Sequence, residues 1–199
     1  MEVRRAEDGT RAWIAEVGEY HHAFGGEYGG MWRRQGRAPN MIAGIGFAAQ
    51  GFGRGAPYVR THHEPERTDW IFEGVDRDVI GDHGVGGGAA GQEIDRFEPT
   101  LGSPRHAVVV ASATEFGPEM LRTKEEFHHT VQDASSMSTV RADMVFYEVD
   151  GGGAVFSTGS IGWFGALASD GYDNDVARIT QNILRRFADP KPFTPPSNG

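Results

Sequence analysis

The chain has 199 residues, of which 38% are apolar and 24% are charged, and its formal net charge is −9. This length suffices for one domain with a buried core, and an apolar fraction that includes 12 phenylalanines and 4 tryptophans excludes a disordered chain. The negative charge argues against a general binder of nucleic acid or of anionic membranes, because such proteins need an excess of lysine and arginine. No run of 18 apolar residues occurs, so no membrane-spanning helix is expected.

The sequence contains no cysteine. This excludes disulfide bonds, thiolate metal sites and a cysteine nucleophile. Residues 1–5 also lack the apolar segment of a secretory signal. We therefore expect a cytoplasmic protein with neither nucleic-acid nor membrane partners.

Short apolar runs and glycine-rich loops alternate through the first half of the chain. Residues 2–7 and 10–16 are predicted to be strands, because Asp8-Gly9 between them favours a hairpin turn. A polar and aromatic loop follows at residues 18–36. Further strands or short buried segments are predicted at residues 41–47, 57–60 and 69–75.

The middle of the chain contains the best candidate for a buried strand. Residues 106–113 include three consecutive valines, which are typical of a strand covered on both faces. Before it lies a glycine-rich loop at residues 81–91 that leads into residues 92–97. After it we predict a helix at 118–128 and a strand at 141–149.

The clearest pattern lies in residues 151–187. A turn at the three glycines 151–153 precedes a strand at 154–158 and a glycine-rich loop. Asp173, Asn174 and Asp175 are candidate N-caps of a helix that ends before Pro190 and Pro192. Its apolar face repeats at helical spacing and consists of Val176, Ile179, Ile183, Leu184 and Phe187.

These elements predict an α/β fold: a mostly parallel sheet flanked by helices, with the terminal helix packed on it. Residues 1–189 form one domain, and residues 190–199 form a loose, proline-rich tail. A strand that begins at residue 2 suggests that the domain starts upstream of this chain. Truncation would leave a sheet edge beside residues 2–7 or 106–113 and would make the chain associate.

The loop at residues 18–36 offers the first candidate site. Glu19, His21, His22 and Glu27 are residue types that ligate a hard metal ion or transfer protons. Their spacing matches no known zinc motif, so a surface loop with aromatic anchors is the favoured alternative.

Other candidate sites have simpler explanations. Gly86, Gly88 and Gly91 match a GxGxxG spacing, but no convincing strand precedes them and Pro99 comes too soon for a long helix, so a tight turn is favoured over nucleotide binding. The histidine pairs 21–22, 62–63 and 128–129 read as surface or loop residues. The hydroxyls at 157, 158 and 160 lack a GxSxG elbow and are expected to bond to backbone.

Several long stretches resemble one family, the C-terminal region of the large (beta) subunit of N,N-dimethylformamidase. They are GEYGGMWRRQGRAPN (26–40), IGFAAQGF (45–52), DWIFEGV (69–75), GGGAAGQEIDRFEPTLGSP (86–104), RADMVFYE (141–148), GGAVFSTGSIGWFGAL (152–167) and YDNDVARITQNILRRF (172–187). The resemblance extends from residue 2 to residue 187.

The resemblance implies an enzyme that hydrolyses a small amide to an amine and formate, with one iron ion held by two tyrosinates and a glutamate. It also implies a domain like that of class I glutamine amidotransferases, without their cysteine. The tyrosine ligands would lie upstream of this chain. Glu27 is the first choice for the glutamate ligand and Glu19 the second, and His21 and His22 are candidate catalytic residues. Asn40, Trp163 and Phe164 are candidate substrate-binding residues.

We therefore expect the C-terminal part of an iron-dependent amidase that is inactive without its upstream half. Its partners would be a small amide substrate, the upstream part of the large subunit or a small subunit, in a homo- or hetero-oligomer. The alternative is a non-catalytic scaffold or oligomerisation fragment of the same fold.

Overall fold

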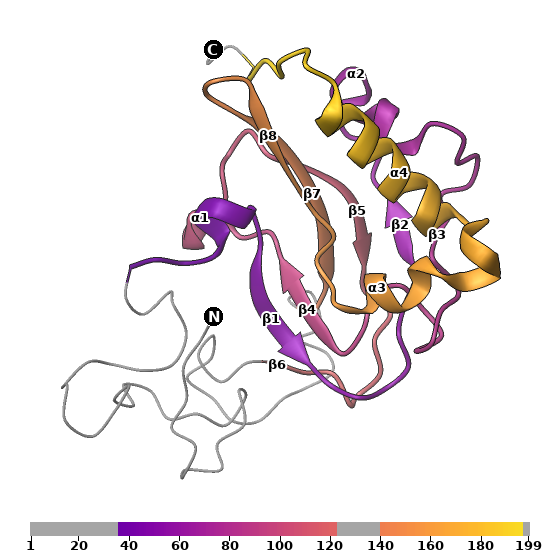
Figure 1. Ribbon diagram of the computed structural model, residues 1–199. Coiled ribbons are helices and arrows are strands. Elements are labelled where there is room, and N and C mark those ends of the chain that lie inside the picture. The colour runs from indigo at the N-terminus through magenta and orange to yellow at the C-terminus, as the bar shows by residue number, and fades with distance from the viewer. Residues whose placement is uncertain (1–35, 123–139, 197–199) are drawn as a thin grey trace, which may run out of the picture.

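The structure of the protein is a computed structural model that describes residues 36–122 and 140–196 (Figure 1). Within these residues, two β-sheets and a set of mostly short helices surround one main core. None of the helices in the described part of the chain is both long and apolar enough to span a bilayer.

Two antiparallel sheets form the framework. The larger has the strand order β3-β2-β5-β7-β8, and its strands are Val79–Ile80, Tyr58–Arg60, Val108–Ala113, Ala142–Val149 and Gly153–Ser157. The smaller has the order β4-β1-β6, with strands Glu93–Arg96, Gly46–Gln50 and Leu121–Arg122. Every pairing between these strands is antiparallel.

The prediction of a mostly parallel sheet flanked by helices was therefore wrong, and so was the expected likeness to amidotransferase domains. The continuous valines of β5 suggested a parallel strand because both of its faces are covered. Here both neighbours of β5 are antiparallel, Val108 and Val110 face the main core, and Val109 is only partly buried beside the smaller cluster. Residues 106–113 also form no sheet edge, because β5 lies between β2 and β7.

Strand β7 lies at the centre of the molecule. Seven of its residues are buried, and they alternate between two clusters. Met144 and Phe146 face the main core, whereas Val145 and Tyr147 face a second, smaller cluster. A shift of register between Val109 and Ala111 of β5 keeps the apolar side chains of both strands on matching faces.

Helix α4 (Asp175–Ala188) and the short helices in contact with it cover the main core side of the larger sheet, whereas α1 (Asn40–Ala43) lies beside the second cluster. The longest helix is α4. Its N-cap is Asn174, whose side chain accepts a hydrogen bond from the N–H of Ala177 at 2.8 Å. Val176, Ile179 and Ile183 of α4 enter the core, as predicted. The other helices are short: α1 Asn40–Ala43, α2 Pro65–Thr68, α3 Gly162–Leu167, η4 Asp69–Phe72, η5 Pro99–Leu101 and η8 Ser169–Tyr172.

The structure confirms the predicted strands at 57–60, 106–113, 141–149 and 154–158, with ends shifted by a few residues. The strand predicted at 69–75 was wrong, because Asp69–Phe72 is a 3-10 helix that packs on α4. Residues 41–47 divide between α1 and β1. Of the helix predicted at 118–128, only residues up to 122 are described, and they include β6. The strands predicted at 2–7 and 10–16 lie outside the described residues.

Candidate functional site

Four of the predicted site residues lie outside the described part of the chain. They are the two candidate glutamate ligands, Glu19 and Glu27, and the candidate catalytic residues His21 and His22. Their roles stay predictions.

Asn40, predicted to bind substrate, is buried in a structural position. Its Nδ2 donates hydrogen bonds to the backbone carbonyl of Arg96 at 3.3 Å and to the hydroxyl of Ser103 at 3.1 Å. A Cβ atom on Gly46 would lie 2.2 Å from the Oδ1 of Asn40, so a glycine is needed there. Asn40 thus ties α1 to the end of β4, and its role toward a substrate stays a prediction.

Trp163 and Phe164 are neighbours on α3 but lie in different environments. Trp163 is buried, donates a hydrogen bond from Nε1 to the hydroxyl of Thr180 at 3.1 Å, and meets the ring of Tyr58 edge-on at 5.9 Å. The side chain of Phe164 is exposed and lines a groove. Trp163 thus anchors α3 in the core, and Phe164 is the one of the pair that a ligand could contact.

The glycine-rich segment at residues 81–91, here the glycine loop, connects β3 to β4. Its backbone lies directly on a neighbouring segment: a Cβ atom on Gly88 would lie 2.5 Å from the N of Ala56. Several of its N–H groups bond within the protein: for example, Ala90 donates to the carbonyl of Ala56, and Gly91 donates to the hydroxyl of Ser160. A two-residue strand, β3, does precede the loop, but strand β4 and not a helix follows. The loop is therefore a packing element and not a phosphate cradle, as favoured from the sequence.

The hydroxyl of Ser160, just after β8, bonds to backbone groups, as predicted. Its Oγ lies 2.8 Å from the carbonyl of Gly91 and 3.0 Å from that of Glu93, and it accepts the N–H of Gly162 at 3.0 Å. The hydroxyl of Ser157 donates to the carbonyl of Ala43 at 2.7 Å. These hydroxyls hold backbone segments together.

The middle of the glycine loop lines one wall of a groove of about 650 Å³, here the loop groove. Its apolar side chains are Phe52, Val85, Ile161 and Phe164, all of them exposed. Arg54 and Gln92 add polar groups to the lining. The loop groove can therefore hold a small molecule that has both apolar and polar parts.

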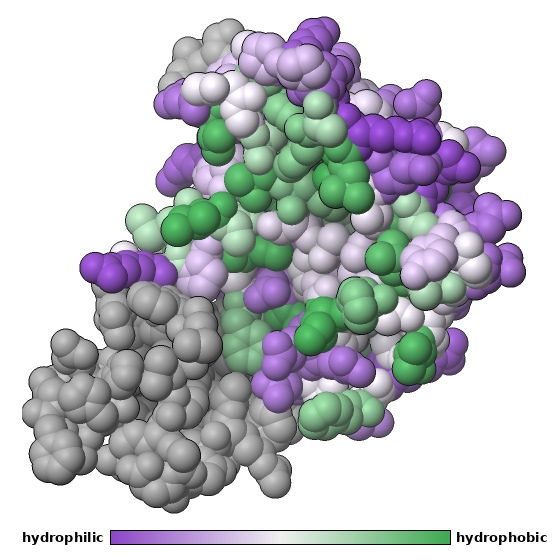
Figure 2. Space-filling view, in the orientation of Figure 1, coloured by the Kyte–Doolittle hydropathy of each residue, from purple (hydrophilic) through white to green (hydrophobic). Residues whose placement is uncertain are grey.

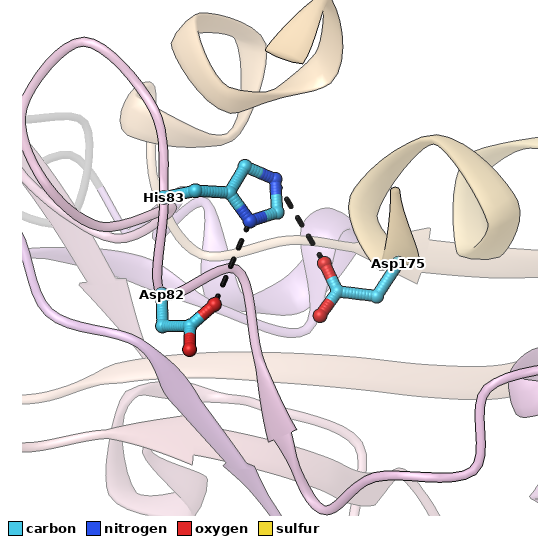
Figure 3. A group of neighbouring side chains, drawn as sticks. All are labelled: Asp82, His83 and Asp175. Carbon is cyan, nitrogen blue, oxygen red and sulfur yellow. Dashed lines mark ion pairs between the residues drawn. The ribbon is translucent and has the colours of Figure 1, made fainter. Parts of the chain in front are cut away.

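The start of the glycine loop meets the start of α4 in a cluster of Asp82, His83 and Asp175 (Figure 3). The Nδ1 atom of His83 lies 3.7 Å from Oδ1 of Asp82, and its Nε2 atom lies 3.9 Å from Oδ1 of Asp175. Both distances exceed that of a hydrogen bond. The imidazole thus stands between two carboxylates without bonding to either.

Neighbouring donors hold both carboxylates of this cluster. Arg77 forms a hydrogen-bonded ion pair with Oδ2 of Asp82, and this contact lowers the pKa of Asp82 below its usual value. Asp175 accepts the N–H of Gly81 at 3.1 and 3.2 Å. Both carboxylates are therefore held in a fixed orientation beside the imidazole.

Two of the three tyrosines in the described residues, Tyr58 and Tyr147, do not suit the iron centre that the resemblance implies. The phenol of Tyr58 donates to the carbonyl of Thr158 at 2.6 Å, and burial raises its pKa well above the usual value. The phenol of Tyr147 donates to the carbonyl of Ile42, and burial raises its pKa too. A tyrosinate ligand needs the opposite shift, so these two phenols do not fit the expected metal set.

A second apolar surface lies on the side of the larger sheet away from α4. Val109, Val149 and Val155 are partly buried there, beside Ala43. Met41 and Ile42 of α1 are exposed, at 56% and 80%. Figure 2 shows apolar side chains gathered over β7, β8 and α1 in this view. We call this surface the valine face.

The sequence did not single out Asp82 or His83, and Asp175 appeared only as a possible helix cap. One usable signal exists: an Asp-His pair interrupts an otherwise small and glycine-rich loop. Its approach to Asp175 depends on how α4 docks, and no local pattern encodes that docking.

The chain matches known proteins along nearly its whole length. The family model for the C-terminal part of N,N-dimethylformamidase beta subunit-like proteins matches residues 1–175. The N,N-dimethylformamidase beta subunit of Paracoccus aminophilus is 39% identical over 197 residues, and that of an Alcaligenes species is 38% identical. Each alignment covers 96% of this chain and 26% of the relative, so the chain spans about a quarter of the length of these relatives. The chain belongs to the N,N-dimethylformamidase beta subunit-like family.

Proposed function

We propose that this chain is the C-terminal part of an amidase that hydrolyses a small amide of the formamide type to an amine and a carboxylate. The observation that carries the proposal is the 39% identity to a dimethylformamidase beta subunit over 96% of the chain. Because the chain spans only 26% of that relative, hydrolysis requires the remaining part of the protein.

The metal of this proposal is a mononuclear iron ion with two tyrosinate ligands and one glutamate. Since Tyr58 and Tyr147 do not fit such a site, the tyrosinates come from the upstream part of the large subunit. Glu27, or Glu19 in its place, is the proposed glutamate, and His21 and His22 are the proposed proton-transfer residues.

The described residues would contribute a wall of the substrate site. The loop groove offers exposed rings from Phe52 and Phe164, which suit the apolar substituents of a small amide. Gln92 and Arg54 offer polar groups beside them. Asn40 and Trp163 would support this wall indirectly, because their side chains fix α1 and α3 in the fold.

The partners of the proposal are the upstream part of the large subunit and a small subunit. The valine face suits the upstream part, because its apolar side chains lie next to β7 and β8 and would be covered by more protein of the same chain. The relatives carry about three times as much additional sequence, which is ample to cover this face.

Complementation tests the proposal. The 199-residue chain would be assayed alone and together with the upstream part of the large subunit and the small subunit, with amine release and bound iron as readouts. We expect no hydrolysis by the chain alone, and hydrolysis with bound iron after complementation. A complemented protein that binds iron neither in purified form nor after reconstitution would contradict the proposal.

The alternative is a non-catalytic scaffold or oligomerisation fragment. The exposed apolar side chains on α1 favour it, because they suit contact with another protein. Phe164→Ala separates the two functions in the complemented protein. An amidase wall predicts a higher KM for the amide, whereas a scaffold predicts unchanged kinetics and an unchanged or weaker association.

A further inference from the structure

We propose that Asp82, His83 and Asp175 bind a divalent first-row transition-metal ion through one imidazole nitrogen and two carboxylate oxygens. These residues come from the glycine loop and from the first turn of α4 (Figure 3). The inference concerns this chain's own residues and does not depend on amide hydrolysis.

The three side chains already converge on one point. With one ligand atom taken from each residue, these atoms all lie within 4.8 Å of one another. Ligand atoms about 2.1 Å from a tetrahedral ion are separated by about 3.4 Å. The widest pair of these atoms would have to approach by no more than about 1.4 Å, which side-chain rotation can supply.

The imidazole of His83 supplies a second observation. Its Nε2 atom is buried and has no hydrogen-bond partner, although it points toward Asp175 at 3.9 Å. Buried polar nitrogens are almost always bonded, so an unbonded one calls for a ligand or a further group. The side chain as a whole is 27% exposed, which leaves an entry path and room for water in the remaining coordination positions.

Neighbouring donors orient the two carboxylates and leave Oδ1 of Asp82 available to an ion. Arg77 holds Oδ2 of Asp82, which leaves Oδ1 facing the imidazole. The N–H of Gly81 holds the carboxylate of Asp175. Such outer contacts fix ligand geometry in metal sites. The guanidinium of Arg77 and the N-terminus of α4 both repel a cation, and the two carboxylates offset this repulsion.

The ligand types decide which ion is favoured. An imidazole nitrogen with two carboxylates suits zinc, cobalt, manganese or iron in the divalent state, whereas magnesium and calcium prefer oxygen ligands throughout. This set also differs from the two tyrosinates and glutamate of the proposed iron centre. We therefore expect preference for Zn²⁺ and Co²⁺ over Mg²⁺.

Calorimetric titration of the metal-free 199-residue chain with Zn²⁺ tests the site, with Co²⁺ absorption as a report on coordination. The test variant is His83→Gln, and the matched control is His62→Gln, because His62 is an exposed histidine whose Nε2 lies 2.8 Å from a single carboxylate, that of Asp78. Removing a side chain that contacts the ion directly should weaken Zn²⁺ binding by more than about tenfold. We expect the wild-type protein and the control to bind one more Zn²⁺ per chain than His83→Gln binds.

Asp82→Asn is the second variant, and it should lose the same equivalent of Zn²⁺. Its side chain is 47% exposed, so the change leaves the core intact even if His83→Gln fails to fold. The proposal is overturned if either variant, correctly folded, binds Zn²⁺ with wild-type stoichiometry and affinity. It is also overturned if Co²⁺ shows the same spectrum in wild type and Asp82→Asn.

Discussion

Tyr58 shows how one side chain joins distant parts of this molecule. It is completely buried, its phenol donates to the carbonyl of Thr158 at 2.6 Å, and its ring meets Trp163. Burial raises its pKa well above the usual value, and the negative charges of Asp95 and Asp143 raise it further. The phenol is therefore neutral in the folded protein and braces β2 against the end of β8.

Tyr58→Phe should lower the free energy of unfolding at pH 7 by about 1–3 kcal/mol, because the carbonyl of Thr158 loses its donor. In the wild-type protein, the raised pKa means that the contribution of the neutral phenol is fully present below pH of about 10. It is lost as the pH rises from there through the folded-state pKa. Urea unfolding at pH 7 and at several values between about pH 9 and pH 11 measures both effects.

The alkaline loss of stability should be smaller in Tyr58→Phe than in the wild-type protein. Tyr172→Phe is the control, because that side chain is largely exposed and should leave the pH profile unchanged. Equal alkaline sensitivity of Tyr58→Phe and wild type would contradict the interpretation.

Among the elements, the glycine loop depends most on side-chain size. Gly88 lies against the backbone of Gly55 and Ala56, with approaches of 2.5–2.6 Å to an added Cβ atom, whereas a Cβ atom on Gly86 would come no nearer than 3.9 Å. The isolated bridge between Ala56 and Ala90 lies in the same region. The loop is therefore fixed on one side and open toward the groove on the other.

Gly88→Ala should destabilise the protein by about 1–3 kcal/mol, because the added methyl group forces two backbone segments apart. Gly86→Ala is the matched control and should change stability by less than about 0.5 kcal/mol. Thermal or urea unfolding of both variants provides the comparison. A Gly88→Ala variant as stable as Gly86→Ala would show that the two segments do not touch.

Patterns that depend on neighbouring residues in the sequence were predictable at this scale. Strand β7 and three residues of the predicted apolar face of α4 appeared in the sequence, because strand and helix periods leave a direct mark, whereas Leu184 and Phe187 of that face are exposed. Asp69–Phe72 was predicted to be a strand because its apolar content resembles one, but its contact with α4 stabilises a 3-10 helix. Tertiary packing thus overrode a short local signal.

The direction of strand pairing and the composition of the site were not predictable in this way. Whether β5 and β7 run parallel depends on the path of the chain between them and not on the residues of either strand. The cluster at His83 likewise depends on Asp175 reaching the glycine loop through α4. The resemblance identified the family correctly, whereas the parallel sheet expected from the elements and from the resemblance was wrong.

At the scale of the whole molecule, the end of the chain helps to close the core. The proline-rich tail was expected to be loose, but Phe193 packs with Trp70, Phe146 and Phe187 at ring distances of 5.4–6.2 Å. The guanidinium of Arg186 lies 3.7 Å from the centre of its ring. The N–H of Phe193 also donates to the carbonyl of Gly152 at 2.9 Å. The tail therefore joins α4 to the turn between β7 and β8.

Phe193→Ala should reduce the free energy of unfolding by about 2 kcal/mol, less than a fully buried phenylalanine would, because its ring is only partly covered. The control is Phe52→Ala, since the Phe52 side chain is 84% exposed. Urea unfolding of the 199-residue chain gives both values. If the two variants were equally stable, the tail would contribute nothing to closing the core.

The antiparallel pairing of β7 with β8 has a consequence for how this protein reaches its folded state. These strands are joined by the turn at residues 150–152, so they can form a hairpin before other contacts exist. The pairings of β2 with β5 and of β4 with β1 must instead wait for the closure of long loops. The β7–β8 hairpin is thus the natural nucleus on which the remaining strands assemble, and a change there would slow folding more than it would speed unfolding.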